Sequence, residues 1–219
     1  MDTVLSATAK TFVDEETIKH DAIPGFFRVI HEVLSPEECW QIINMAENKG
    51  FEKAALYTDH TGHDHFSDTR KSQRCIIDTF GFAEELWRRL KAVVPPVWHT
   101  ANQTVVGINE RLRILKYHPG DEFKMHSDGA YTAPNGDTSK ITILVYLNEG
   151  YEGGFTHYSS YEGMIAVVPK VGSVVLQDQA LGHCVPPLQK GVKYALRTEV
   201  MYRPVPAASQ EYREFVIKE

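Results

Sequence analysis

The chain has 219 residues, 42% of them hydrophobic, and a formal net charge of −6 at neutral pH. This length and apolar content suffice for the core of one domain, and the acidic balance argues against a nucleic-acid-binding protein, which would normally present a basic surface. We see no apolar run of roughly 18 residues and no basic-then-apolar N-terminus, so we expect a cytoplasmic protein without a membrane partner. An odd number of cysteines without zinc-finger spacing (Cys39, Cys75, Cys184) favours buried thiols in a reducing compartment.

A strand and a helix are expected near the N-terminus. Phe26–Val33 is apolar enough for a strand. A helix should follow, with Ser35 as N-cap, Pro36 at the first helical position and Glu38 closing a capping box. Gly50 is a natural place for this helix to end.

Further along, apolar residues recur at helical spacing over Phe82–Val94, and Pro95 with Pro96 should end this second helix. From Thr104 onward, short β-rich runs alternate with turn residues. The runs are Thr104–Ile108, Leu112–Tyr117, Ile141–Leu147, Phe155–Tyr158, Met164–Val168, Ser173–Leu176 and Lys193–Tyr202. Such a series fits a β-sandwich or a jelly-roll barrel, and the pattern alone does not choose between them.

Three local basic clusters interrupt the acidic chain, and we expect them to be solvated helix or strand faces. The clusters are Arg70-Lys71 with Arg74, Arg88-Arg89 with Lys91, and Arg111 with Arg113 and Lys116.

The most informative motif is His126-Ser-Asp128, followed by His183 and then by Lys193. Two histidines and one carboxylate are the ligand set that holds Fe(II) on one face and leaves the opposite positions open. On a strand, side chains two residues apart point to the same face, so His126 and Asp128 could reach one ion. The absence of cysteine from this set argues against a structural zinc site.

Five segments around these residues occur in an order that is typical of one enzyme family. They are Leu115–Gly120 with Phe123, His126–Gly129, Ile141–Asn148 followed by Glu152–Thr156, Val168–Leu176, and His183 with Pro186, Pro187, Gly191, Lys193 and Tyr194. Through them the stretch from about Asn109 to Pro204 resembles the Fe(II)/2-oxoglutarate oxygenases of the prolyl 4-hydroxylase type.

This resemblance implies a mainly β fold with some α-helix, a double-stranded β-helix (jelly-roll) barrel with supporting N-terminal helices. The expected organisation is a tail over residues 1–22 and a single oxygenase domain over 23–219. Within that domain we expect helical support over 23–103, a catalytic core over 104–204 and a C-terminal tail over 205–219. The implied activity is 2-oxoglutarate-dependent hydroxylation, with Fe(II), 2-oxoglutarate as cosubstrate, O2, and ascorbate as reductant.

The resemblance also implies roles for particular residues. His126, Asp128 and His183 would be the catalytic metal ligands. Lys193 would pair with the distal C5 carboxylate of 2-oxoglutarate, and Tyr146 would donate its hydroxyl to that carboxylate. The remaining candidates are Arg197 as a second anchor or substrate contact, Tyr117 in the cosubstrate site, and Asn109, Arg111, Arg113 and Tyr131 along the substrate pocket.

The segment Asp59–His65 holds three histidines and two aspartates, but it is polar and contains glycine. We therefore expect a mobile loop, which the resemblance places as a flap over the active site, rather than a second metal site. A prolyl or other residue of a protein or peptide is the expected substrate. A free amino acid or small molecule, or a metal-binding barrel without catalytic activity, remain alternatives, and the sequence leaves the oligomeric state unknown.

Overall fold

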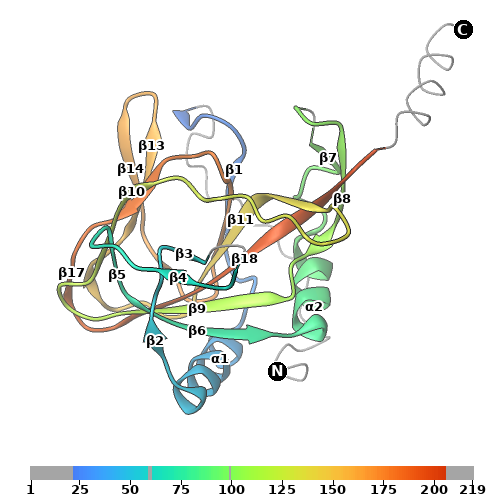
Figure 1. Ribbon diagram of the computed structural model, residues 1–219. Helices are drawn as coiled ribbons and strands as arrows, with labels where there is room; N and C mark the ends of the chain where they lie inside the picture. Colours follow the sequence, from blue (N-terminus) through green and yellow to red (C-terminus); the bar gives the residue numbers. More distant parts are fainter. Residues whose placement is uncertain (1–21, 59–60, 99, 206–219) are drawn as a thin grey trace, which may run out of the picture.

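The computed structural model describes residues 22–58, 61–98 and 100–205, and Figure 1 shows their arrangement. The predicted tails lie almost wholly outside these residues. The described chain forms two large antiparallel sheets, one of nine strands and one of five, with two helices packed on the larger sheet.

The nine-stranded sheet forms the base of the fold. Its main path runs β1 (Phe27–Ile30), β15 (Val174–Asp178), β11 (Thr138–Tyr146), β18 (Lys193–Pro204), β9 (Arg111–Tyr117), β6 (Gln73–Asp78) and β2 (Glu52–Lys53). Two further strands extend from β18, namely β8 (Gln103–Ile108) and its neighbour β7 (Val97–Trp98).

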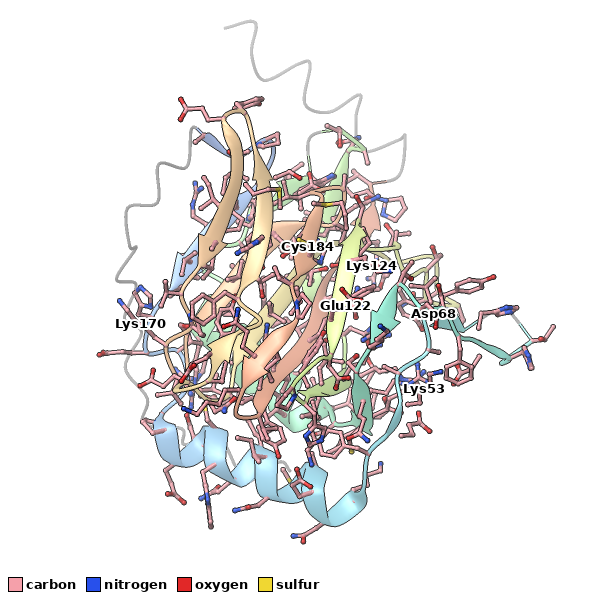
Figure 2. All side chains as sticks on the ribbon, turned by 90° about the vertical axis from the view of Figure 1, so that its left-hand side faces the viewer. Lys53, Asp68, Glu122, Lys124, Lys170 and Cys184 are labelled. Atoms are coloured by element: carbon pink, nitrogen blue, oxygen red, sulfur yellow. The ribbon has the colours of Figure 1, made fainter. Side chains whose placement is uncertain are left out.

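The five-stranded sheet, which faces the viewer in Figure 2, covers the base on one side. Its order is β14 (Gly163–Val167), β13 (Thr156–Ser160), β16 (His183–Val185), β10 (Glu122–His126) and β5 (Arg70–Lys71). Two short pairs complete the fold: β12 (Glu152–Gly153) with β17 (Leu188–Lys190), and β3 (Tyr57–Thr58) with β4 (Asp64–His65). The predicted mainly β, jelly-roll architecture is confirmed, although the two large sheets remain separate and do not close into a continuous barrel.

Helix α1 (Pro36–Lys49) forms as its capping residues predict. The Ser35 hydroxyl accepts a hydrogen bond from the Glu38 amide at 3.1 Å, and the Glu38 carboxylate accepts one from the Ser35 amide at 2.9 Å. The helix ends at Gly50, whose φ of 95° suits a residue without a Cβ atom.

Helix α2 (Phe80–Leu90) differs from its predicted range of Phe82–Val94 at both ends. Thr79 is the actual N-cap, since its hydroxyl accepts a hydrogen bond from the Phe82 amide. The helix also ends at Leu90, before Pro95 and Pro96 are reached, and the intervening residues form a turn.

The segment 23–103, expected to form the helical support, contains both described helices. This segment also contains β6, which pairs with β9 along six residues and so belongs to the main sheet.

The prediction that the basic clusters are solvated is wrong for three of their residues, because Arg70, Arg74 and Arg89 are all less than 9% exposed. Arg89 lies between the helices, where it forms a buried ion pair with Glu38.

Alternation along the central strands gives the main sheet two different faces. In β18, Leu196 and Val200 belong to the core that includes the helices, whereas Lys193 and Arg197 point to the opposite side. Figure 1 shows both helices on the outer side of the main sheet, away from the five-stranded sheet. Neither described helix is long and apolar enough to cross a membrane.

Candidate active site

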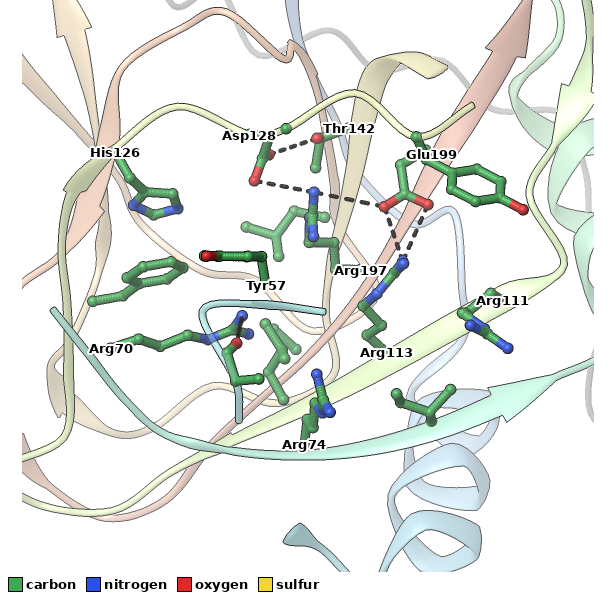
Figure 3. Close-up of a pocket in the computed structure, with 18 of the residues that line it drawn as sticks. Tyr57, Arg70, Arg74, Arg111, Arg113, His126, Asp128, Thr142, Arg197 and Glu199 are labelled. Carbon is green, nitrogen blue, oxygen red and sulfur yellow. Dashed lines mark hydrogen bonds and ion pairs between the residues drawn. The ribbon is translucent and has the colours of Figure 1, made fainter. Parts of the chain in front are cut away.

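A cavity of about 980 Å³ lies between the two sheets. Its wall includes residues from β9, β11 and β18 of the main sheet and from β10 and β16 of the smaller sheet. Tyr57, from the β3–β4 hairpin, also lines it, and Figure 3 shows the polar side chains that point into it. The polar face of the main sheet is therefore the floor of a pocket.

His126, Asp128 and His183 meet in this pocket, with one potential ligand atom from each lying within 4.8 Å of the others. His126 ends β10 and stands opposite His183, the first residue of β16, in the antiparallel register. Asp128 is not on the strand, contrary to the sequence-based argument. It follows the end of β10, where its amide donates a hydrogen bond to the Gln179 carbonyl at 2.9 Å.

Backbone carbonyls determine which nitrogen of each imidazole faces the cavity. The Nδ1 atom of His126 lies 2.8 Å from the Lys124 carbonyl oxygen, and Nδ1 of His183 lies 3.0 Å from that of Leu181. A carbonyl oxygen only accepts, so Nδ1 donates in both rings and Nε2 keeps its lone pair; the side-chain amide of Gln177 also lies 3.1 Å from Nδ1 of His183. Burial and the neighbouring His183 lower the pKa of His126 to about 4, so this imidazole is neutral at physiological pH.

Both carboxylate oxygens of Asp128 are held by side chains. Oδ2 accepts a hydrogen bond of 2.6 Å from the Thr142 hydroxyl, and Oδ1 lies 3.1 Å from Arg197 Nη2. Burial alone would raise the pKa of Asp128, but Arg197 and His183 outweigh it and lower that pKa. The carboxylate is therefore ionised.

These residues fit a divalent iron. Two imidazoles with a free Nε2 and one ionised carboxylate, with no thiolate, match the ligand set preferred by Fe(II) in oxygenases. In the described part of the chain, no other cluster of three or more potential ligands of this kind is found. The histidine-rich segment supplies none: His65 stacks on Tyr57 and contacts His63, while His60 lies outside the described residues.

Lys193 is the most deeply buried cation of the pocket, with 1% of its surface exposed. Its Nζ atom donates to the Gly154 carbonyl at 2.7 Å and to the Thr156 hydroxyl at 3.4 Å. It also lies over the rings of Tyr117 and Tyr146, at 5.3 and 5.8 Å from their centroids. Among the described residues, no carboxylate pairs with Lys193, and burial lowers its pKa to about 7.

Three buried tyrosine hydroxyls make no hydrogen bond of regular geometry in the described structure, those of Tyr146, Tyr151 and Tyr158, although those of Tyr146 and Tyr158 interact with each other. Tyr146 does not itself line the cavity, whereas Tyr117 does. A buried cation without a carboxylate partner, close to the hydroxyl of Thr156 and the ring of Tyr146, is an environment suited to a carboxylate. The sequence singled out Tyr146 and Tyr117 but assigned no role to Tyr158 or Thr156.

Unlike Lys193, Arg197 pairs with carboxylates of the protein. In addition to Asp128, it lies 3.5 Å from Glu199, which also pairs with Arg113 at 2.9 Å. Although burial opposes its charged form, Asp128 and Glu199 raise the pKa of Arg197.

The other predicted pocket residues are also brought together. Asn109, Arg111, Arg113 and Tyr131 all line the cavity, with Arg111 paired to Asp78 near the surface. Sequence reasoning did not identify Thr142, Glu199 or Arg70. Thr142 and Glu199 lie on the same strand faces as Tyr146 and Arg197, so their alternation was an available signal.

The comparisons with known proteins agree with this geometry. The model of the 2OG-Fe(II) oxygenase superfamily matches residues 112–198. Probable prolyl 4-hydroxylase 10 of Arabidopsis thaliana is 28% identical over 147 residues, covering 64% of this chain and 47% of that protein. The chain thus spans about half the length of the curated relatives it matches.

Two solved structures show the same fold. The collagen prolyl hydroxylase of Paramecium Bursaria Chlorella virus-1, in complex with 2OG, has a TM-score of 0.56 and 18% identity, covering 83% of this chain and 98% of that one. A prolyl hydroxylase from Trichoplax adhaerens, bound to a hypoxia inducible factor peptide, has a TM-score of 0.58 and 18% identity, covering 80% and 82%. Residues 112–198 thus match the 2OG-Fe(II) oxygenase superfamily, and the chain is similar in sequence to prolyl 4-hydroxylases.

Proposed function

We propose that this chain is an Fe(II)- and 2-oxoglutarate-dependent dioxygenase that hydroxylates an unactivated C–H bond. One observation carries the proposal: a group of two histidines and an aspartate shares a cavity with a buried lysine that no described carboxylate neutralises. When bound, the metal and 2-oxoglutarate supply the oxidising chemistry with O2, and 2-oxoglutarate leaves as succinate and CO2. The protein's residues bind, orient and shield these groups.

His126, Asp128 and His183 would hold the metal. Their hydrogen bonds fix them for this task, because the backbone orients both imidazoles and Thr142 with Arg197 orients the carboxylate. Such outer contacts keep ligands in place before the metal arrives. Arg197 is thus a positioning residue.

Lys193 would pair with the C5 carboxylate of 2-oxoglutarate, with hydroxyls such as that of Thr156 close to the same charge. Arg197 ranks second as an anchor because two carboxylates already engage it. Tyr117 would form one wall of the cosubstrate site through its contact with Lys193. A metal-binding barrel without catalytic activity would not require a buried lysine that lacks a carboxylate partner. The presence of Lys193 in the same cavity as the three ligands therefore favours the enzyme.

A prolyl residue of a protein or peptide is the substrate that the relatives' names favour, since the Arabidopsis protein is named as a probable prolyl 4-hydroxylase and the Trichoplax enzyme holds a peptide. The β3–β4 hairpin would cover the substrate, because Tyr57 and Gly62 line the cavity. The same chemistry on a free amino acid or small molecule is the second candidate, favoured by the arginine-rich wall described below.

A turnover screen tests the proposal. The protein is incubated with Fe(II), ascorbate and 2-oxoglutarate across proline-containing peptides and free amino acids, following succinate and a mass gain of about 16 Da, that of one inserted oxygen. We expect substrate-dependent succinate formation, which His183→Ala abolishes while the protein stays folded. Anaerobic titration separately measures binding of Fe(II) and 2-oxoglutarate. A wild-type protein that binds neither would refute the proposed function.

A further inference from the structure

Arg70 is a buried arginine of the pocket wall that forms no ion pair with a described carboxylate. Arg70 lines the cavity, and only 7% of its surface is exposed. Nη1 donates to the Ala55 carbonyl at 2.9 Å and Nε to the Ser72 hydroxyl at 3.4 Å, and no described residue accepts a hydrogen bond from Nη2. A buried guanidinium without a countercharge is costly, so this wall is suited to receive an anion.

The other arginines of the cavity wall all have acidic partners. Their ion pairs are Arg74 with Glu52 and Asp64, Arg111 with Asp78, Arg113 with Glu199, and Arg197 with Asp128 and Glu199. In the described wall this leaves Lys193 and Arg70. Lys193 is assigned above to the C5 carboxylate of 2-oxoglutarate. The C1 carboxylate would need no further cation if it binds the metal, because a divalent ion would balance the charges of Asp128 and of that carboxylate.

Arg70 stands close to the proposed metal site. Its guanidinium carbon lies 4.8 Å from the centroid of the Phe123 ring, and the same ring stacks on His126 at 3.5 Å. Figure 3 shows Arg70 and His126 in the same pocket, together with the neighbouring Arg74. Burial lowers the pKa of Arg70; Tyr117 and the more distant Asp128 raise it, and Arg197 and Arg74 lower it further, so that the pKa lies below its usual value. The surroundings of Arg70 therefore favour a negatively charged ligand.

We propose that Arg70 binds a carboxylate of the prime substrate, so that this oxygenase acts on a carboxylate-bearing compound rather than on a neutral prolyl segment. The inference rests on the proposed function and names its substrate class. A single guanidinium matches one carboxylate through two parallel hydrogen bonds. A phosphate dianion would require two cations without acidic partners. Apart from Lys193, which is assigned to 2-oxoglutarate, the described wall offers only Arg70.

Two matched pairs of probes test this assignment and distinguish the sources of the carboxylate. One pair is L-proline and L-prolinamide. The other is the blocked tetrapeptide acetyl-Ala-Pro-Glu-Ala-amide and its counterpart with Gln in place of Glu. Binding is measured by calorimetry with the full chain loaded with Mn(II) and 2-oxoglutarate under anaerobic conditions, so that turnover is not needed.

We expect the carboxylate member of one pair to bind at least about tenfold more tightly than its amide, as a charge-assisted hydrogen bond requires. Arg70→Gln should reduce this preference to below about twofold, and Arg70→Lys should retain part of it. Lys71→Gln is the matched control: it removes one charge from the same strand at an exposed residue, paired with Glu122, outside the pocket wall. It should keep the full preference.

The assignment is overturned if wild-type protein binds acid and amide equally in both pairs, or if Arg70→Gln keeps the preference. It is also overturned if Arg70→Gln weakens 2-oxoglutarate instead, which would place Arg70 in the cosubstrate site. Thermal unfolding of each variant separates loss of the fold from loss of the contact. A wild-type chain that binds neither Mn(II) nor 2-oxoglutarate would refute the proposed function itself, which is a different result from the loss of acid preference.

Discussion

Arg197 Nη2 lies 3.1 Å from Asp128 Oδ1, so a strand of the main sheet holds the carboxylate that follows the end of a strand in the opposite sheet. Thr142, on the neighbouring β11, donates to the other oxygen of the same carboxylate. Asp128 lies where strand pairing does not constrain it. Its position therefore depends on these two side chains and on the hydrogen bond of its amide.

This relationship predicts the behaviour of Arg197→Gln. The variant removes the side chain that orients Asp128 and lowers its pKa, so metal affinity should fall by roughly ten- to a hundredfold, as expected when an outer partner of a ligand is lost. Affinity for 2-oxoglutarate, measured at saturating metal, should change little. Metal titration followed by 2-oxoglutarate titration separates the two. A large loss of 2-oxoglutarate affinity with normal metal binding would show that Arg197 is the anchor.

Lys193→Met should have the opposite signature. The variant keeps the apolar stem but leaves the C5 carboxylate of 2-oxoglutarate buried without a charge partner. Loss of one member of a buried pair costs ~3–5 kcal/mol, so affinity should fall at least about a hundredfold. Metal binding should persist, because Lys193 is not one of the three proposed ligands. Anaerobic titration of the Fe(II) protein, following charge-transfer absorbance, measures this, and unchanged 2-oxoglutarate affinity would contradict the assignment.

The same lysine predicts a pH dependence of cosubstrate binding. In the free protein burial lowers the pKa of Lys193 to about 7, and a bound carboxylate would raise that pKa. Below pH 7 the amine is already charged, so affinity should be constant. Above pH 7 binding must take up a proton, so affinity should fall by up to about tenfold per pH unit until the pKa of the complex is reached. Calorimetry in buffers of different ionisation enthalpy measures the proton uptake. In Lys193→Met this pH dependence should disappear.

Folding stability provides a prediction away from the pocket. Arg89 on α2 makes two hydrogen bonds of 2.9 Å to the Glu38 carboxylate on α1, and both side chains are at most 6% exposed. Arg89→Met strands that buried carboxylate and should cost ~3–5 kcal/mol of unfolding free energy. Adding Glu38→Gln removes the stranded charge and keeps the capping hydrogen bond, so it should restore part of the loss. Chemical denaturation measures both, and a loss below about 1 kcal/mol for Arg89→Met would contradict the argument.

The features that the sequence predicted are those encoded locally. The capping residues Ser35 and Glu38 define the start of α1 within four positions of the chain. Most strands of the core were placed to within a few residues from their apolar runs, and the two histidines and the aspartate were identified from their family order. Alternation also predicted that Lys193 and Arg197 share a face, which the cavity lining confirms.

The features that it missed depend on contacts between distant segments. Arg70 belongs to a cluster that looked solvated, and its burial follows from the packing of β5 beside β10 in the smaller sheet. Asp128 is held beside the two histidines by Thr142 and Arg197, which lie 14 and 69 positions away in the chain. The strand geometry that its spacing suggested does not position it. Glu199 pairs with Arg113 because β18 and β9 are adjacent. None of these neighbours can be read from local spacing.

The β3–β4 hairpin carries the last prediction. Tyr57 lines the cavity while remaining 55% exposed, and it stacks on His65 across the hairpin at 4.5 Å. If the hairpin closes over the substrate, backbone amides of residues 61–69 should gain protection from hydrogen exchange when substrate binds to the metal- and 2-oxoglutarate-loaded protein. Tyr57→Ala should raise the substrate KM several-fold and leave 2-oxoglutarate affinity unchanged, because Lys193 and not Tyr57 is assigned to the C5 carboxylate. Replacing His60, His63 and His65 together should leave the iron content unchanged. Equal protection with and without substrate, together with an unchanged KM for Tyr57→Ala, would mean that the hairpin is a static part of the rim.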